Sequence, residues 1–443
     1  MFIYIKTMAR RIITAIDVGS SKVTTVIAAV EENETRPTVI GVYTHSGTGI
    51  KKGVIVNIEE ATNSIGESIT AAERMAGVTV SDVYVTINGE QITSINNKGV
   101  VAVSAGNEIT MEDTYRAIEN AKTLTLPQNI SPVHIIPREF VVDNQGGIKY
   151  PIGMTGMRLE VETHIITAPM SSLQNLIKCV QQIALEVNDV VFTGWASSLA
   201  VLTDTEKDLG VAMLDIGAGT TTITIFQDGA ISYSGCIPLG GSSITSDIAI
   251  GLQLTLEDAE KVKLNMHKIL DDKVGAVEVD ENIPSLLRAK EGEDKEKKKK
   301  NPDNVDVSAL GITSKTEISK TLLRQIVEAR LQEIFDLAKN VVSRGGFDLA
   351  MPAGIVLTGG TAQLHDISKV AQESFNVPVR VGYPSGLTGM VEEISSPANS
   401  AVQGLIKYAL EDDFDGGSQT KRSSSNSGNV ISKVVNWVKS LLP

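Results

Sequence analysis

The chain has 443 residues, which is too long for a single ordinary core and predicts two or more domains. Apolar residues make up 42% of the chain, a share typical of a soluble globular protein. With 53 acidic against 40 basic residues the formal net charge is -13, so the chain should repel nucleic acid, and we expect no nucleic-acid partner. No stretch approaches the roughly 20 apolar residues that a membrane-spanning helix requires.

The first segment, MFIYIKTMAR, is too short for a secretory signal peptide and lacks a small-residue cleavage site. We interpret residues 1–10 as a flexible lead, with initiation at either Met1 or Met8, and expect a cytoplasmic protein. Cys179 and Cys236 lie far apart among apolar neighbours, which favours buried thiols over a disulfide or metal site. The five histidines are scattered and form no zinc pattern.

The first half of the chain begins with three strand-like runs, at residues 12–16, 23–30 and 39–43. A helix is predicted over residues 58–75, where apolar residues recur at helical spacing, and a further strand over 83–87. This order of hairpin, strand and helix is typical of a ribonuclease-H-like half.

The pattern changes near residue 89. Residues 89–169 predict a compact inserted α+β domain with its own elements: strands at 100–103, 134–142 and 158–167, and a helix at 111–124.

From residue 209 the plan of hairpin and helix repeats, with a helix beginning near Ser242. A charged stretch ending in AKEGEDKEKKKKNPDN predicts a solvated loop, with a docking site as the minor alternative. Two helices and a strand complete this half: helices at 317–343 and 397–410, and a strand at 354–357. Residues 411–428 are acidic and then rich in Ser, Gly and Asn, which predicts a flexible tether.

Three Gly-rich loops are the main chemical signal. IDVGSSKV (residues 16–23) and LDIGAGTTTI (214–223) each link two apolar runs, the pattern of a hairpin whose turn directs backbone N–H groups outward and can cradle a phosphate. Asp17 and Asp215 offer carboxylates suited to Mg²⁺. The third loop is LTGGTAQL (357–364), and none of the three has the Walker A spacing. One such turn would be an ordinary hairpin, but three in this order indicate a split nucleotide site.

These loops resemble those of the actin, Hsp70 and sugar-kinase superfamily: two phosphate loops followed by an adenosine loop. The resemblance covers nearly the whole chain, since candidates for the two connecting helices lie at 195–202 and 398–408. It implies an α/β, actin-like, duplicated two-lobe ribonuclease-H-like fold with an inserted small α+β, SHS2-like subdomain.

The last segment, NVISKVVNWVKSLLP (residues 429–443), predicts an amphipathic, locally cationic helix. A Trp-containing apolar face flanked by lysines can lie in the headgroup region of an anionic membrane, although docking on the protein's own core is the alternative. One such helix binds weakly, so stable attachment predicts self-association. The apolar face comprises Val430, Ile431, Val434, Val435, Trp437, Val438, Leu441 and Leu442.

The loops, the insert and the tethered tail together resemble the FtsA family of bacterial cell-division proteins, with local matches in FTGWASSLAVLT and IPLGGSSITSDIAIGL. The resemblance implies subdomain 1A (11–88 and 170–208), subdomain 1C (89–169) and subdomains 2A and 2B (209–410). It also implies an ATP-binding, actin-like polymer at the cytoplasmic face of the membrane, at the division site. Such a polymer anchors FtsZ filaments and recruits later division proteins through 1C.

The same resemblance assigns the site residues. ATP and Mg²⁺ would lie between the lobes, with Mg²⁺ held between Asp17 and Asp215 through water. Lobe closure about the connecting helices would link nucleotide state to polymer shape. Phosphate contacts would come from Asp17, Gly19, Ser20, Ser21 and Lys22 in one lobe and Asp215, Gly217, Gly219, Thr220 and Thr221 in the other. Gly240 and Gly241 begin a helix that can face the nucleotide, Gly359 and Gly360 would approach the adenosine, and Glu260 and Lys263 would contact the nucleoside or form a surface ion pair.

Two further expectations concern hydrolysis and partners. Relatives that hydrolyse ATP carry Glu-Pro in the first connecting helix, whereas this chain has Gly194-Trp195, so hydrolysis should be slow or undetectable and ATP mainly structural. Arg324 and Arg330, with Lys320 on the same helix, are candidate contacts for the acidic FtsZ C-terminal tail, although pairing with nearby glutamates is equally plausible by charge.

Other members of the superfamily offer alternatives. A pilus-assembly protein of the PilM type has a similar body but normally lacks the tethered helix. A sugar or acetate kinase needs a catalytic base in a substrate cleft, and the sequence nominates none. An Hsp70-type chaperone would need a β-rich domain after the ATPase body.

Overall fold

The loop around Asp17 is the turn of a hairpin between β1 (Arg11–Val18) and β2 (Lys22–Val30), two apolar, β-branched strands that pair antiparallel along their length. The computed structural model describes residues 11–31, 36–103, 108–123, 126–271 and 303–414. The hairpin belongs to a six-stranded sheet in the order β11-β6-β1-β2-β3-β19. Its other strands are β3 (Thr38–Ser46), β6 (Asp82–Ile87), β11 (Glu186–Phe192) and β19 (Thr388–Gly389).

The second lobe repeats this plan. The loop around Asp215 joins β12 (Val211–Ile216) and β13 (Thr221–Gln227), again an antiparallel hairpin whose first strand pairs parallel with a later one, β17 (Ile355–Thr358). The sheet has five strands in the order β14-β13-β12-β17-β18, with β14 (Ala230–Ile237) at one edge and β18 (Val379–Val381) at the other. Each Asp-containing loop therefore lies at the same place in its own sheet.

Helices cover the first sheet on both faces. α1 (Ile58–Ala76) begins where the Asn57 side chain accepts from the backbone of Glu59 and Glu60, and ends at Gly77 in the left-handed conformation. It packs with α3 (Met170–Gln181) on one face. The other face is covered by α4 (Thr193–Val201) and α11 (Ser400–Phe414). Short elements complete the lobe: β4 (Ile50–Lys51), β5 (Val54–Ile55), and 3-10 turns at Glu392–Ile394 and Pro397–Asn399.

Helices α4 and α11 are the two connecting helices, and they cross with their backbones in contact. A Cβ atom added to Gly404 of α11 would collide with the carbonyl of Ala196 in α4, so only glycine allows this approach. The first turn of α11 begins beside the loop at Gly359, whose N–H donates to Pro397 O at 3.1 Å. The pair of helices therefore links the core of the first lobe directly to the junction between the lobes.

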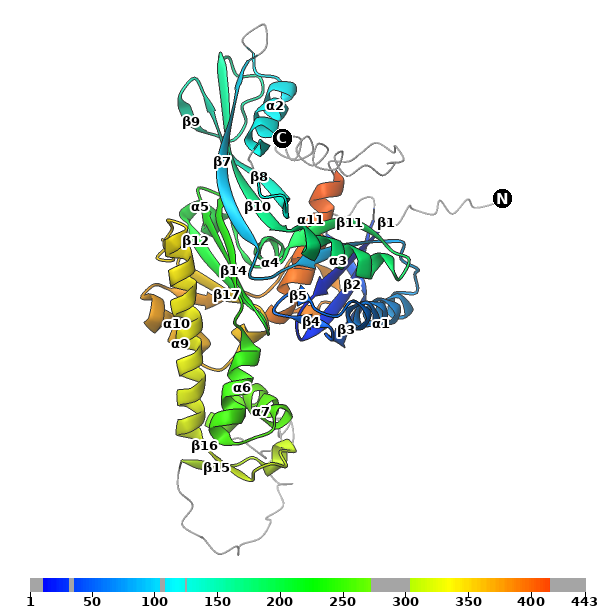
Figure 1. Ribbon diagram of the computed structural model, residues 1–443, viewed down its shortest axis with the longest axis vertical. Coiled ribbons are helices and arrows are strands. Elements are labelled where there is room, and N and C mark those ends of the chain that lie inside the picture. The colour runs from blue at the N-terminus through cyan, green and yellow to red at the C-terminus, as the bar shows by residue number, and fades with distance from the viewer. Residues whose placement is uncertain (1–10, 32–35, 104–107, 124–125, 272–302, 415–443) are drawn as a thin grey trace, which may run out of the picture.

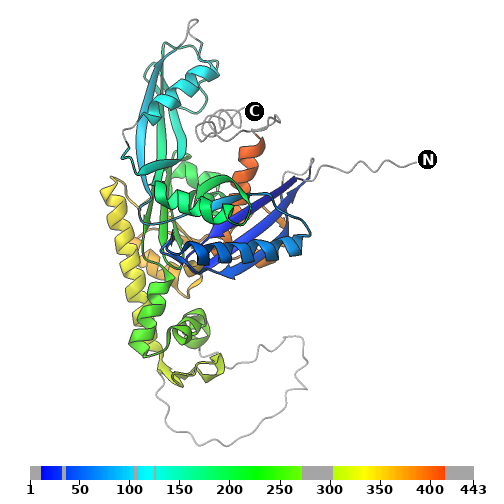
Figure 2. The ribbon, with the colours of Figure 1, turned by 45° about the vertical axis from the view of Figure 1, so that its right-hand side comes forward.

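The inserted segment forms a separate four-stranded sheet in the order β7-β10-β8-β9, with one helix packed on it. Figures 1 and 2 show it at one end of the molecule, opposite α6 and α7. This arrangement and the duplicated sheets confirm the predicted two-lobe α/β fold with an α+β insert. The elements of the insert are β7 (Thr93–Ala102), α2 (Met111–Lys122), β8 (Ile130–Val142), β9 (Gln145–Ile148) and β10 (Arg158–Pro169).

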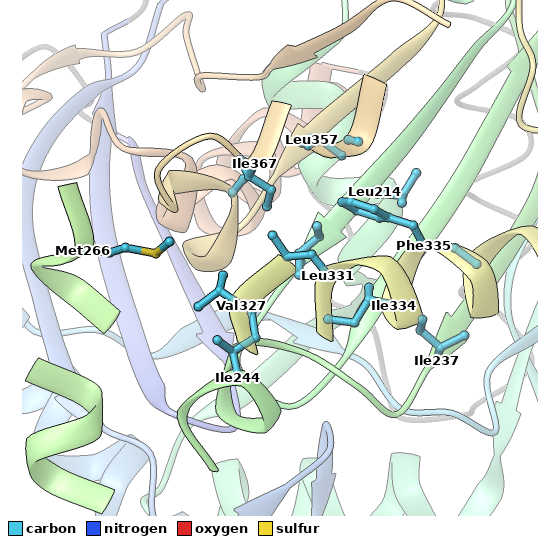
Figure 3. Packing of buried hydrophobic residues seen from close by; sticks show 14 of the residues in the cluster. Leu214, Ile237, Ile244, Met266, Val327, Leu331, Ile334, Phe335, Leu357 and Ile367 are labelled. Carbon is cyan, nitrogen blue, oxygen red and sulfur yellow. The ribbon is translucent and has the colours of Figure 1, made fainter. Parts of the chain in front are cut away.

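The second lobe is built around the long helix α9 (Lys320–Arg344). Figure 3 shows Val327, Leu331, Ile334 and Phe335 of α9 facing Leu214 and Leu357 of the sheet in one apolar cluster. The spacing of these α9 residues is that of one helical face, which explains why the helix lies along the sheet. The remaining elements are α5 (Asp204–Leu209), α6 (Gly241–Leu252), α7 (Leu256–Leu264), α8 (Met266–Leu270), β15 (Asn304–Asp306), β16 (Glu317–Ser319), α10 (Ile367–Phe375), and 3-10 turns at Ser308–Leu310 and Gly360–Gln363.

Several predicted boundaries differ from the structure. The helix predicted from residue 317 begins at Lys320, because residues 317–319 pair with β15 and the Ser319 hydroxyl caps the helix by accepting from Leu322 N. α11 begins after a Pro-initiated 3-10 turn and continues past residue 410 to Phe414. Residues 1–10, most of the charged stretch, and the predicted membrane helix at 429–443 lie outside the described residues. Within the described ranges no helix combines the length and apolarity needed to cross a bilayer.

Candidate functional site

A cavity of about 500 Å³ lies between the two lobes, a size typical of small-molecule sites. All three Gly-rich loops line it, as the sequence pattern predicts for a single split site. The residues singled out from the sequence that line it are Asp17, Gly19, Ser20, Ser21, Lys22, Asp215, Gly217, Gly219, Thr220, Glu260, Lys263, Gly359 and Gly360.

The first loop is a tight turn held by its own backbone. Gly19 N donates to Lys22 O at 3.0 Å, and a Cβ atom at Gly19 would lie 2.8 Å from that same oxygen, which explains the glycine. The Asp17 carboxylate accepts a hydrogen bond from the Thr86 hydroxyl on neighbouring β6 at 2.8 Å. The Thr86 hydroxyl oxygen in turn accepts from Val18 N at 3.0 Å. The loop and its carboxylate are therefore oriented by a strand that lies distant in sequence.

The second loop has the same construction. Gly217 N donates to Thr220 O at 2.9 Å, and the Asp215 carboxylate accepts from the Ser197 hydroxyl of α4 at 2.5 Å. Gly359 has φ +86, and a Cβ atom there would collide with Asp215 Oδ1. The third loop therefore approaches the second carboxylate so closely that only glycine fits.

The two phosphate-type loops touch each other across the cleft. A Cβ atom at Gly219 would lie 2.8 Å from Ser20 Oγ and 3.1 Å from the Cα atom of Lys52. The Ser20 hydroxyl oxygen already accepts from Gly53 N at 2.8 Å, which fixes its position. Any bulk added at Gly219 would therefore separate the lobes at the centre of the cavity.

Burial shifts the pKa values of the charged side chains that line the cavity. It raises the pKa of Asp215 to about 6, an effect that the Ser197 hydrogen bond opposes and the nearby Asp17 carboxylate reinforces. Burial also raises the pKa of Asp17, against the Thr86 hydrogen bond and the charge of Lys22. The pKa of Lys22 is lowered by burial, although both aspartates favour its charged form, and its ammonium donates to Asn399 Oδ1 at 2.8 Å.

These carboxylates suit a hydrated divalent cation. Asp215 is buried and Asp17 half-buried, and both have raised pKa values. The two carboxylates are hard oxygen ligands whose repulsion Mg²⁺ would relieve. Within the described part of the chain no three His, Cys, Asp or Glu residues gather closely enough to hold a metal on their own. A magnesium ion here would take its remaining ligands from water and phosphate oxygens, which is its usual mode of binding.

Glu260 and Lys263 line the other end of the cavity and also pair with each other. Lys263 Nζ lies 2.7 Å from Glu260 Oε2 and donates to Thr245 Oγ1 at 2.9 Å. The two side chains therefore line the cavity and also form the i, i+3 ion pair that the sequence offered as the alternative. Gln363 and His365 complete this end of the wall.

Three predicted contact residues do not line the cavity. The Thr221 hydroxyl donates to Leu239 O at 2.9 Å and is buried away from the cleft. Gly240 and Gly241 support the second loop from behind. The N–H of Gly241 donates to Gly217 O at 2.9 Å and that of Ser242 to Ala218 O at 2.8 Å. Because the second loop occupies these N–H groups, the first donors of α6 hold the loop rather than open onto the cavity.

Several residues that shape the site escaped sequence reasoning. Thr86, Asn88, Ser197 and Asn399 hold the loops or their charged side chains, and each comes from a segment outside the three Gly-rich motifs. The only sequence signal was the position of Ser197 in a family-like stretch, FTGWASSLAVLT.

The two arginines proposed as partner contacts differ. Arg330 forms a two-point ion pair with Asp247 of α6, at 2.5 and 2.9 Å, and a third bond to Glu333 Oε2 at 2.5 Å. Arg324 is exposed on α9, and no hydrogen bond or ion pair joins it to another described residue. Arg330 is thus held within the second lobe, whereas Arg324 faces outward.

Comparisons with known proteins give the family. A cell division protein FtsA from Pseudomonas aeruginosa is 34% identical over 434 residues, which cover 97% of this chain and 98% of the relative. The chain belongs to the FtsA family. An FtsA from Borreliella burgdorferi is 36% identical over 432 residues, covering 97% of this chain and 98% of that protein. The family description "Cell division protein FtsA" matches residues 212–404, and "SHS2 domain inserted in FTSA" matches residues 89–167.

One solved structure shows a similar fold. The "PilM-PilN type IV pilus biogenesis complex" contains a chain with a TM-score of 0.57 and 14% identity, covering 90% of this chain and 98% of that one. At this identity the likeness shows a shared actin-like fold and leaves the assignment to the FtsA family unchanged.

Proposed function

We propose that the protein binds ATP with Mg²⁺ in the interlobe cavity and that this nucleotide stabilises the form that assembles with copies of itself. The observation that carries the proposal is the convergence of three Gly-rich loops, two aspartates with raised pKa values and Lys22 on one cavity of about 500 Å³. Tight turns supply backbone donors for phosphate oxygens, while the two carboxylates supply oxygens for the cation.

The walls of the cavity favour binding over rapid hydrolysis. A Cβ atom at Gly194 would lie 2.7 Å from Thr222 Cγ2 and 2.8 Å from Phe192 Cε1, so an acidic side chain has no room there. The acids that line the cavity among the described residues are Asp17, Asp215 and Glu260, and each already accepts a hydrogen bond or ion pair. Asp17 and Asp215 would face the cation and Glu260 is paired with Lys263, so none of these acids remains to orient the attacking water, and we expect at most weak ATPase activity.

Calorimetry tests the nucleotide proposal directly. Mg-ATP should bind the full chain, and Asp17→Asn should weaken binding at least about tenfold, because the variant loses a charge that faces the cation. Asp82→Asn is the matched control, since Asp82 lies at the opposite end of β6 from Thr86, outside the cavity. Absence of any heat or competition with adenine nucleotides in the wild type would remove the proposal.

We further propose that the chain acts at the cytoplasmic face of the cell membrane, at the division site, where it anchors FtsZ filaments and recruits later division proteins through the insert. Membership of the FtsA family supports the role in division. The amphipathic pattern of residues 429–443 supports attachment to an anionic membrane, and several copies in a polymer would supply the avidity that one short helix lacks.

Cosedimentation with anionic liposomes tests the anchor. Trp437→Glu places a charge on the predicted apolar face and should abolish sedimentation, while Mg-ATP binding persists. Asn436→Glu makes the same addition of charge on the predicted polar face and should reduce sedimentation far less. Equal behaviour of the two variants would contradict the amphipathic anchor.

A further inference from the structure

The inserted subdomain is hydrogen-bonded to the second lobe, although the chain connects it to the first. The contact is made on β14, the edge strand of the second-lobe sheet. The Ser94 hydroxyl accepts from Ser234 N at 2.9 Å and donates to Ser234 O at 2.8 Å, and Asn96 Nδ2 donates to Ser232 O at 3.0 Å. Side chains of β7 thus satisfy backbone groups that an edge strand would otherwise expose.

A second layer of the contact involves His164 and Arg138. His164 is fully buried, with Nδ1 2.6 Å from Asn96 Oδ1 and Nε2 2.9 Å from Ser234 Oγ. Because the Asn96 amide nitrogen donates elsewhere, its oxygen accepts from His164 Nδ1, and Nε2 therefore accepts from the Ser234 hydroxyl. Arg138 donates to Ser232 Oγ at 2.7 Å. We call Ser94, Asn96, Arg138 and His164, with Ser232 and Ser234, the latch.

The His164 ring is neutral in this setting. Burial lowers the pKa of His164 to about 3, and the charge of Arg138 acts in the same direction. The latch therefore consists of neutral groups and one charged group, the Arg138 guanidinium. Arg138 forms an ion pair with Glu162 at 2.5 Å. Apart from Arg138 Nε, which has no hydrogen-bond partner among the described residues, the polar groups of the latch pair only when the insert and the second lobe are in register. Losing one member therefore leaves further buried polar groups unpaired.

The other end of this connection lies in the cavity. Asn88 follows β6 and precedes Gly89, where the inserted segment begins with φ +140. Asn88 Nδ2 donates to Thr220 Oγ1 of the second loop at 3.0 Å, and its Oδ1 accepts from Gly89 N at 2.8 Å and from Thr222 Oγ1 at 3.3 Å. One side chain thus joins the cavity, the second loop and the first residue of the insert.

We propose that Asn88 and the latch make the inserted subdomain follow the second lobe, so that occupancy of the cavity sets the position of the insert. The inference rests on the proposed nucleotide site and names its regulation. Phosphate groups entering at Thr220 would change the partners available to Asn88, and the latch would carry a movement of the β13-β14 hairpin into β7. Asn88 is a positioning residue in this scheme, acting on the insert through Gly89 and the second loop.

If the cavity and the latch are coupled, a change at either one should be measurable at the other. If the latch holds the lobes with the two phosphate-type loops in contact, releasing it should weaken Mg-ATP binding although no latch residue lines the cavity. Conversely, removing the Asn88 side chain should loosen the latch even without nucleotide. A merely structural role of Asn96 inside the insert would give Asn96→Ala no effect on Mg-ATP binding beyond that of Asn97→Ala.

The test combines amide hydrogen exchange at Ser234 with Mg-ATP binding, both measured on the full chain. Without nucleotide, Asn88→Ala should speed exchange of the Ser234 amide by about fivefold or more, the scale of a typical coupling energy. With Mg-ATP as the probe, Asn96→Ala should weaken binding by a similar factor. Asn97→Ala is the matched control, because its neighbouring amide instead donates to Ala121 O within the insert at 2.7 Å, and it should alter neither measurement.

The outcomes separate the two proposals. Unchanged Ser234 exchange in Asn88→Ala overturns the coupling, and so does wild-type Mg-ATP affinity in Asn96→Ala. Equal effects of Asn96→Ala and Asn97→Ala would also overturn it, because the insert would then act only through its own stability. A wild type that ignores Mg-ATP would end the proposed function, whereas the exchange arm would still decide whether Asn88 and the latch are coupled.

Discussion

Asp215 should reduce the stability of the nucleotide-free protein, and replacing it with Asn should therefore stabilise the chain. The residue is only 7% exposed, and burial raises the pKa of its carboxyl group from 3.8 to about 6. The folded state thus holds the proton more tightly than the unfolded state. The stability that protonation provides is complete below about pH 3.8 and is lost as the pH rises through about 6.

The size of the effect follows from the shift. A change from 3.8 to about 6 corresponds to about 3 kcal/mol of destabilisation by the ionised group at pH 8. Asn keeps an oxygen that can accept from Ser197 and carries no charge. Asp215→Asn should therefore raise the free energy of unfolding by up to about 3 kcal/mol at pH 8, and the gain should shrink towards pH 4.

Urea unfolding of the wild type and of Asp215→Asn between pH 4 and pH 8, without Mg-ATP, measures this difference in the free energy of unfolding. Asp258→Asn is a control of opposite sign, because hydrogen bonds from Ser314 lower the pKa of Asp258 to about 2 and its charge favours the folded state. A variant Asp215→Asn that is no more stable than the wild type at pH 8, or whose gain is independent of pH, would refute the argument. The same variant should bind Mg-ATP more weakly, since the cation loses a ligand.

Three further outcomes are expected. Gly219→Ala should weaken Mg-ATP binding at least about tenfold in calorimetry, because its Cβ would lie 2.8 Å from Ser20 Oγ and separate the loops, whereas retained affinity would show that the contact is dispensable. Gly404→Ala should cost about 1–3 kcal/mol in thermal unfolding, because its Cβ would collide with Ala196 O. Gly66→Ala on α1 should instead gain about 0.5–1 kcal/mol, because its Cβ would make only an ordinary contact with Ile183 Cγ2 at 3.5 Å. Arg324→Glu should reduce binding of an acidic FtsZ tail peptide in fluorescence anisotropy more than Arg330→Gln does, and the reverse order would place the peptide elsewhere on the second lobe.

Local patterns predicted the scaffold of the site well. The Asp17 and Asp215 loops are hairpin turns between neighbouring strands, so their form depends on residues close in sequence. The side chains that hold these two carboxylates could not be predicted in this way, because they come from segments distant in sequence. Ser197 comes from a different element, and its bond to Asp215 depends on how α4 crosses the sheet. No periodicity or spacing encodes such a crossing.

The beginning of α6 shows a subtler limit. Gly240 and Gly241 correctly indicated the start of a helix, and a free helix N-terminus is a natural phosphate site. The sequence does not reveal that carbonyls of Gly217 and Ala218 turn back to accept its first N–H groups. The helix predicted from residue 317 also began too early, because residues 317–319 pair with β15 across the turn formed by residues 307–316, and this pairing outweighs a helix-compatible composition.

Helix α11 has one end in the cavity wall and the other at the last described residue. Ala401 in its first turn faces the cavity, and Phe414 at its end precedes the segment that contains Trp437. A 15-residue helix is about 22 Å long and resists stretching, because each turn is closed by hydrogen bonds. Force applied to the chain beyond Phe414 therefore arrives at the wall of the cavity without passing through a flexible joint in the body. If the chain assembles on a lipid surface as proposed, tension on its C-terminal segment would act directly on the proposed nucleotide cavity.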